Sequence, residues 1–279
     1  MGINAEMVRI VLELRRDEFA KGDSVLEFGA QDLCAAPDVV EFIFGEHGRR
    51  GITEPVLTAK SLYANAGYQR YISVDAIGQD GALVYDLNKD LVADYGFTDQ
   101  FDLVTNLGTA EHCFNQFQFF KNAHDTCRAG GLMIHAAPCA GNVNHGFFNY
   151  QPRFFADLAA ANGYEMLRMA FTVDYNSKLF RYDPEVFRKY DSRDLLLYVI
   201  LRKARDVPFQ TPFDGMFAAE NSLTSYQDAG PNPLSTDFSP YLKGSGWQGT
   251  KGYAELPWWR RETMRRVLAR LPFSQLIRR

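Results

Sequence analysis

The stretch FDLVTNLGTAEHCFNQ, residues 101–116, decides the fold. It opens as a run of apolar and β-branched residues that predicts a buried strand. Several polar side chains then follow within a few positions of one another: Asn106, Glu111, His112, Asn115 and Gln116. Polar groups placed so closely after a buried run raise the question of what they do at the end of the strand, and the rest of the chain supplies the context.

Strands and helices are predicted to alternate on both sides of this stretch. Further short apolar runs predict strands at residues 24–28, 71–75, 82–86 and 132–136, while the stretch itself supplies a strand at 101–105. Helical spacing covers residues 3–20, 35–44, 58–66, 87–95 and 114–128, the last leading into Gly130 and Gly131. Residues 152–162 predict another helix ended by Gly163, and residues 164–173 and 195–202 predict two more strands. This alternation predicts an α/β fold with a seven-stranded, mostly parallel sheet covered by helices on both faces.

The composition changes near residue 207, where Pro, Gly, Ser, Asn and aromatic residues replace the periodic patterns. A structureless stretch of that length is unusual inside a compact domain. We therefore expect an α/β domain over residues 1–205 and an irregular C-terminal extension over residues 206–279, which would act as a substrate cap or as an oligomer contact.

The overall composition is that of an ordinary globular protein, with 46% hydrophobic and 23% charged residues. A net charge of −4 and a pI near 5.8 give no general attraction for nucleic acid phosphates. The four cysteines form no C-x-x-C pair, which favours reduced thiols, and no run approaches the roughly 18 apolar residues of a membrane span. We expect a cytoplasmic protein without a transmembrane segment or a nucleic acid partner; a homodimer is left open.

The ends of the first three strands carry the candidate nucleotide-binding residues, because ligands of open parallel sheets bind outside the carboxyl ends of the strands. In LEFGAQD, residues 26–32, Gly29 allows a tight turn and Glu27 places a carboxylate at the strand edge; an ordinary turn without a ligand is the alternative. Asp75 suits a ribose diol, because a carboxylate accepts two hydroxyl hydrogen bonds. Asp86 could accept from an adenine amino group with Leu87 beside the ring, or it could cap a helix that starts at Leu87.

Taken together, these residues resemble the motif series of the class I S-adenosylmethionine-dependent methyltransferases. The resemblance covers about residues 8–202 and includes Glu27-x-Gly29, Asp75, Asp86-Leu87-Asn88, and FDLVTNLGTAEH followed by CRAGGLMIHAAP. It implies the strand order 3-2-1-4-5-7-6 with the seventh strand antiparallel, and the methyl acceptor over the fourth strand. The cofactor site that it implies consists of Glu27, Gly29, Gln31, Asp75, Asp86, Leu87 and Asn106. Gln31 departs from the pattern, since members commonly carry a second glycine in the first motif.

Residues 106–112 would then form the floor between methyl donor and acceptor. The pair Glu111-His112 resembles the Glu-His that follows the fourth strand in the quinone O-methyltransferases and their relatives. Some of these hold a divalent metal with a Glu-x-x-Glu-His cluster, but Gly108 stands at the first glutamate here, so no metal is expected unless another segment supplies a ligand. His112 is a candidate general base; the alternative is a structural residue that opens a helix, with Glu111 favoured there by the helix dipole.

A second polar and aromatic cluster follows the fifth strand, in HAAPCAGNVNHGFFNYQPRFF, residues 135–155. A glycine-bearing loop with interleaved aromatic and polar side chains is typical of a pocket wall or lid. We assign Glu111, His112 and His145 to the catalytic residues, and Asn149 and Tyr150 to substrate binding. The alternative is that the aromatic side chains of this loop hold the next helix on the core.

The sequence therefore predicts an S-adenosylmethionine-dependent methyltransferase that yields S-adenosylhomocysteine. The acceptor would be an oxygen or nitrogen of a small molecule or sugar, in a natural-product or surface-polysaccharide pathway. A non-catalytic binding or regulatory protein with the same fold is an alternative, because fold alone does not fix function. An NAD-linked oxidoreductase is a further alternative, against which the absence of a G-x-G-x-x-G fingerprint speaks.

Overall fold

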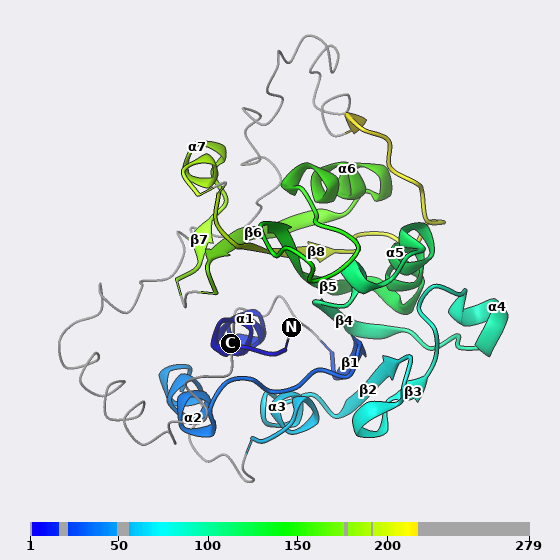
Figure 1. The fold of residues 1–279 in the computed structure, drawn as a ribbon. Helices are drawn as coiled ribbons and strands as arrows, with labels where there is room; N and C mark the ends of the chain where they lie inside the picture. Colours follow the sequence, from blue (N-terminus) through cyan, green and yellow to red (C-terminus); the bar gives the residue numbers. More distant parts are fainter. Residues whose placement is uncertain (1, 17–21, 49–55, 176–177, 191, 217–279) are drawn as a thin grey trace.

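The computed structural model describes residues 2–16, 22–48, 56–175, 178–190 and 192–216, which form one sheet with helices on both faces (Figure 1). The strands are β1 (Ser24–Phe28), β2 (Arg70–Asp75), β3 (Leu83–Val84), β4 (Phe101–Leu107), β5 (Cys127–Ala140), β6 (Glu165–Val173), β7 (Phe180–Arg181) and β8 (Leu195–Arg202). The α-helices are α1 (Ala5–Arg16), α2 (Pro37–Glu46), α3 (Ala59–Asn65), α4 (Leu91–Tyr95), α5 (Gln116–Thr126), α6 (Pro152–Asn162) and α7 (Pro184–Arg188), and two 3₁₀ turns are η1 (Gln79–Gly81) and η2 (Ala110–His112).

The sheet has the order β3-β2-β1-β4-β5-β8-β6-β7. Strands β1 to β5 pair in parallel, whereas β8 runs antiparallel to both of its neighbours, β5 and β6. The order expected from the sequence is confirmed, with β8 as the predicted seventh strand. One strand was not predicted: β7 pairs with the outer edge of β6, and its two residues are too few to show a period.

The start of α4 differs from the sequence prediction. The helix begins at Leu91 instead of Leu87, because Asp90 is its cap and accepts hydrogen bonds from the amides of Val92 and Ala93. Strand β3 is correspondingly short. Residues 85–90 therefore form a loop at the end of β3, which leaves the side chains of Asp86 and Leu87 outside any helix.

The end of α5 also differs. The helix stops at Thr126, and β5 begins at Cys127, so Gly130 and Gly131 lie within the strand range and do not end the helix. A Cβ on Gly131 would lie 2.9 Å from the carbonyl oxygen of Arg128 and 3.0 Å from that of Asp102. The glycine is there because backbone segments approach closely at this bulged pairing of β4 and β5.

Two hydrophobic clusters cover the two faces of the sheet. Helices α1, α2 and α3 pack on one face, and helices α4, α5, α6 and α7 contribute to the other. The strands between them are buried on both faces, which explains their continuous apolar runs. The buried sheet thus fixes the positions of its strand ends, and a site can be built from the residues that follow them.

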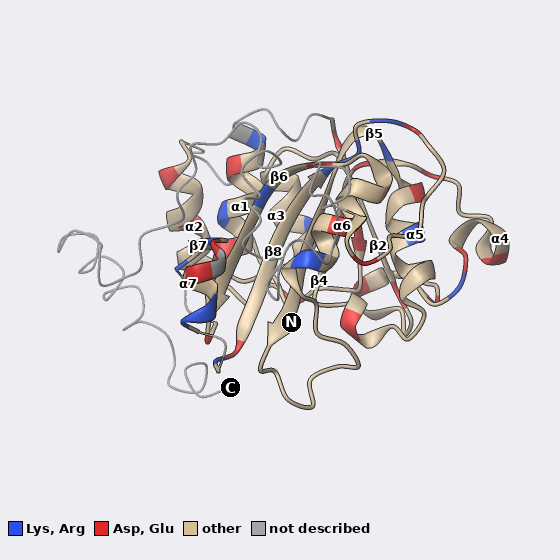
Figure 2. Ribbon diagram, turned by 90° about the horizontal axis from the view of Figure 1, so that it is seen from above, with Lys and Arg blue, Asp and Glu red and all other residues tan. Residues whose placement is uncertain are grey.

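Charged residues of both signs lie mainly on the helices and loops (Figure 2). No helix in the described part of the chain is long and apolar enough to cross a membrane. The segment after β8 packs on the domain as far as it is described: Gln210 exchanges hydrogen bonds with Asn162 of α6, and the amide of Gly215 donates to Asp157. The boundary at residues 205–206 stays a prediction, and residues 217–279 of the expected extension lie outside the described residues.

Candidate active site

A cavity of about 340 Å³ opens at the carboxyl ends of β1, β2, β3 and β4. Parallel pairing places these ends together, since Phe28 of β1 is level with Val74 of β2 and with Asn106 of β4. The lining residues are Gly29, Ala30, Gln31, Asp75, Ala76, Tyr85, Asp86, Leu87, Asn88, Gly108, Thr109, His112 and Cys113. Five of the seven predicted cofactor residues are therefore brought together here, along with one predicted catalytic histidine.

The turn after β1 requires a glycine. Gly29 has φ +85°, and a Cβ at this position would lie 2.4 Å from Oγ1 of Thr109. Thr109 cannot retreat freely, because its hydroxyl donates to the carbonyl of Phe28 at 2.7 Å and accepts from Nε2 of Gln31 at 3.0 Å. Gln31 thus ties the first turn to the loop after β4.

Asp75 faces the cavity from the end of β2. Its Oδ2 accepts a hydrogen bond from the amide of Ala30 at 3.3 Å, and its Oδ1 accepts one from the amide of Ile77 at 2.8 Å. These two contacts hold the carboxylate at the strand end and tie it to the turn after β1. An ionised carboxylate has about four lone-pair sites, so Asp75 can accept further hydrogen bonds from a ligand.

Asp86 shapes the loop after β3. Its Oδ1 accepts from the amide of Asn88 at 2.9 Å and from Nδ2 of Asn88 at 2.8 Å, which forms an Asx turn. The amide of Asp86 donates to the hydroxyl of Tyr95, whose ring stacks on Tyr85 with centroids 4.3 Å apart. The sequence alternative in which Asp86 caps a helix at Leu87 is wrong, since α4 starts later and has its own cap.

Two predicted cofactor residues, Glu27 and Asn106, do not line the cavity. Glu27 is fully buried, with Oε2 accepting from the hydroxyl of Tyr71 at 2.6 Å. Asn106 accepts from the amides of Thr109 and Ala110 at 3.2 and 3.0 Å, which bends the chain after β4. Both side chains support the loops that form the cavity.

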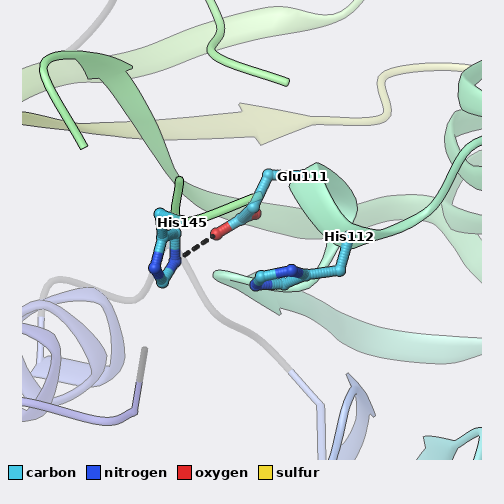
Figure 3. Close-up of side chains that lie close together, drawn as sticks. All are labelled: Glu111, His112 and His145. Carbon is cyan, nitrogen blue, oxygen red and sulfur yellow. Dashed lines mark ion pairs between the residues drawn. The ribbon is translucent and has the colours of Figure 1, made fainter. Parts of the chain in front are cut away.

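The three predicted catalytic residues lie close together (Figure 3), and one of them, His112, lines the cavity. Glu111 and His112 come from η2, and His145 comes from the loop between β5 and α6. Nε2 of His145 lies 3.5 Å from Oε1 of Glu111, and the two imidazole rings are 5.1 Å apart. Glu111 is completely buried, His145 is half-buried and His112 is exposed toward the cavity.

Backbone contacts hold the two segments together. The amide of Phe147 donates to the carbonyl of Glu111 at 2.7 Å. Gly146 makes this approach possible, because a Cβ there would lie 2.9 Å from the same carbonyl oxygen. Nε2 of Gln116 donates to the carbonyl of Ala110 at 2.8 Å. This polar residue of the opening stretch therefore stabilises η2.

Burial sets the protonation of the cluster. It raises the pKa of Glu111 to about 7. It lowers the pKa of both histidines, and His145 lowers that of His112 further. Both imidazoles are therefore neutral near pH 7, and each has a lone pair available for a proton or a metal ion.

The predicted substrate-binding residues lie away from the cavity lining. Tyr150 is buried among aromatic side chains of α5 and α6, and its hydroxyl donates to Oε1 of Gln116 at 2.6 Å. Asn149 is exposed and donates to the carbonyl of Gly141 at 3.2 Å. Their role in substrate binding stays a prediction, while the contacts of Tyr150 agree with the alternative that the loop aromatics pack on the core.

Several cavity residues were not among the site residues assigned from the sequence, notably Thr109, Tyr85 and Cys113. Thr109 lies in the predicted floor of residues 106–112, but no role was assigned to it. Tyr85 and Cys113 had no signal, because an aromatic residue at a strand end and a cysteine in a turn are more often core residues.

No protein-family model matches the sequence, and no curated protein matches it significantly. Among solved structures, the chain is similar to 1,6-didemethyltoxoflavin-N1-methyltransferase of Burkholderia thailandensis, solved with S-adenosylhomocysteine, at 14% identity and a TM-score of 0.40 over 71% of this chain and 78% of that one. TehB of Haemophilus influenzae shows 12% identity and a TM-score of 0.41 over 70% and 61%. A SAM-dependent methyltransferase of Archaeoglobus fulgidus shows 13% and 0.39 over 71% and 94%.

These structural similarities are weak, and the fold class of this chain is assigned from its sheet. Its order, with the antiparallel β8 inserted between β5 and β6, is the one that the motif resemblance implied. The chain has the class I methyltransferase fold, with a cavity at the carboxyl ends of its parallel strands.

Proposed function

We propose that this protein is an S-adenosylmethionine-dependent methyltransferase that methylates an oxygen or nitrogen of a small molecule or sugar. The observation that carries the proposal is the cavity, in which a glycine turn and two carboxylates converge from the ends of β1, β2 and β3. Such a site suits a nucleoside with an attached amino acid, because it offers close backbone approach at one end and hydrogen-bond acceptors at the other.

Each part of the cofactor has a candidate partner in the cavity. Gly29 lets the backbone approach the methionine part, and Asp75 accepts from the two ribose hydroxyls. Asp86 accepts from the adenine amino group, with Leu87 against the ring. This assignment uses residues that already line the same cavity.

The acceptor would enter beside His112, which belongs both to the cavity lining and to the cluster with Glu111 and His145. Methyl transfer is an in-line displacement whose barrier is lowered largely by positioning. A neutral imidazole can take the proton of the acceptor, and partial desolvation at the cavity edge favours the neutral form of His112 by lowering its pKa.

The test is calorimetric titration of the purified protein with S-adenosylmethionine, S-adenosylhomocysteine and NAD in parallel. We expect micromolar binding of the two sulfur nucleotides and none of NAD, followed by transfer of a labelled methyl group in a screen of hydroxylated and amino acceptors. Binding of NAD alone would support the oxidoreductase alternative. Binding of none of the three would support a non-catalytic protein with this fold.

A further inference from the structure

Glu111 presents a buried carboxylate that accepts no hydrogen bond within the described residues, although its Oε1 lies 3.5 Å from Nε2 of His145. Its exposed fraction is 0%, and within the described residues neither of its oxygens, nor Nε2 of His145, has a hydrogen-bond partner. Buried polar atoms are nearly always hydrogen-bonded, since leaving them bare costs free energy. Two carboxylate oxygens and an imidazole nitrogen that face one another without hydrogen bonds therefore indicate a ligand that bridges them.

The geometry of the cluster suits a metal ion. One ligand atom from each of Glu111, His112 and His145 lies within 4.8 Å of the others. Four ligands at about 2.1 Å from a tetrahedral ion lie about 3.4 Å from one another. The 3.5 Å between Nε2 of His145 and Oε1 of Glu111 already matches this separation, and the ring of His112 lies 5.1 Å from the ring of His145.

We propose that Glu111, His112 and His145 bind one divalent transition-metal ion at the acceptor end of the cavity. Two imidazoles and one carboxylate are a ligand set for zinc, cobalt or iron(II), whereas magnesium and calcium prefer oxygen ligands. Gly108 cannot supply a ligand, and His145 in the loop after β5 supplies the third ligand in its place. Proximity of these residues is fixed by the backbone, through the bond from Phe147 to Glu111 and the close packing at Gly146.

A metal with three protein ligands keeps a coordination position open, as in catalytic zinc sites. On the cavity side of His112, that position would take the hydroxyl oxygen of the acceptor and lower its pKa. The bond from the cofactor sulfur to the methyl group then breaks as the bond from methyl to oxygen forms, S-adenosylhomocysteine leaves, and the hydroxyl proton passes to solvent. This catalytic role of the metal rests on the proposed function. It selects hydroxyl acceptors over amines and makes His112 a metal ligand in place of a free base.

Metal binding is tested on the tag-free full chain after treatment with EDTA. Cobalt(II) is titrated with visible absorption as the readout, and zinc is titrated by calorimetry. We expect one ion per chain, with magnesium unable to compete. Glu111→Gln and His145→Ala should each weaken binding at least about tenfold. The matched control is His47→Ala, since His47 lies at the end of α2 outside the cluster.

Gly146→Ala is a second variant that keeps all three ligands. Its Cβ would meet the carbonyl oxygen of Glu111 at 2.9 Å, so the loop that carries His145 must shift. We expect metal affinity to fall several-fold while the circular dichroism spectrum is unchanged. This variant keeps the test decisive where loss of a ligand also unfolds the chain.

Binding of no ion, or binding that survives both ligand substitutions, would overturn the metal site. Titration of the same samples with S-adenosylmethionine separates the two proposals. Metal binding without nucleotide binding would retain the site and reject the methyltransferase function, whereas nucleotide binding without metal binding would do the reverse. With an acceptor in hand, turnover that EDTA does not change would also reject a catalytic metal.

Discussion

The nucleotide side and the acceptor side of the site are built differently. Gly29, Asp75 and Asp86 each follow a strand, so the order of the sheet is enough to bring them into one cavity. Glu111 and His145 come from separate loops, and they meet only because the chain at Gly146 packs on η2. The nucleotide side therefore depends on sheet topology and the acceptor side on local loop packing, so the two sides should respond separately to substitution.

The largest effect is expected on the acceptor side. His112→Ala should lower turnover by about 10²-fold or more, since it removes either a proton acceptor or a metal ligand. Cofactor affinity should stay within about twofold, because the nucleotide partners come from other strands. Initial rates on an acceptor found in the screen and calorimetry with S-adenosylhomocysteine measure the two quantities. A parallel loss of cofactor affinity would show that the two sides are not separate, and His47→Ala is the control.

The corresponding change on the nucleotide side is Asp75→Ala. Loss of a charged acceptor for the ribose hydroxyls should weaken cofactor binding at least about tenfold, or about 1.4 kcal/mol. Cobalt binding should be unchanged, since Asp75 is not in the metal cluster. Asp99→Ala, at an exposed ion pair with Arg70, is the control. Unchanged calorimetric affinity in Asp75→Ala would remove this residue from the ribose site.

Asp86→Asn tests the nucleotide side of the site, with a smaller expected effect on cofactor affinity. An amide retains one acceptor oxygen for the turn at Asn88 but accepts more weakly from an adenine amino group, so we expect about fivefold weaker binding, or about 1 kcal/mol. S-inosylhomocysteine, which has a carbonyl in place of that amino group, serves as the probe. Wild type should discriminate against it, and Asp86→Asn should discriminate less. Equal discrimination by both proteins would place the adenine elsewhere.

The smallest effect is expected at Glu27, the buried residue that supports the loops around the cavity, and it concerns stability. Burial raises the pKa of Glu27 to about 8, against hydrogen bonds from Tyr71, Gln31 and Tyr63 that lower it. The folded state thus holds this proton more tightly than the unfolded state, whose pKa is near 4.5. Its contribution to stability is fully present below that value and is lost as the pH rises through about 8.

We therefore expect the melting temperature to fall between about pH 7 and about pH 9, above the range in which the histidines titrate, and to fall less in Glu27→Gln. Burial also raises the pKa of Glu6 and of Glu111 to about 7, so part of the slope remains in the variant. Glu41→Gln on the exposed side of α2 is the matched control. Parallel slopes in wild type and Glu27→Gln would contradict the raised pKa of Glu27.

The sequence by itself determined most of the sheet. The bounds of β1 and β8 were predicted correctly, because buried strands are short apolar runs with polar residues or turns at both ends. The strand order came from the motif resemblance. The start of α4 was predicted wrongly, since Asp86 and Asp90 have the same capping chemistry and only the folded backbone shows which one is used.

Tertiary structure alone decided which polar residues face the cavity. In the sequence, Glu27, Asn106 and Asp75 all stand at or near strand ends. Side chains alternate between the two faces of a strand, and the loops after the strands turn. In the folded protein, Glu27 and Asn106 therefore support the loops around the cavity, while Asp75 lines it. The same holds for His145. Its distance to Glu111 depends on one glycine and one backbone hydrogen bond between segments far apart in the chain, and no local pattern encodes such a contact.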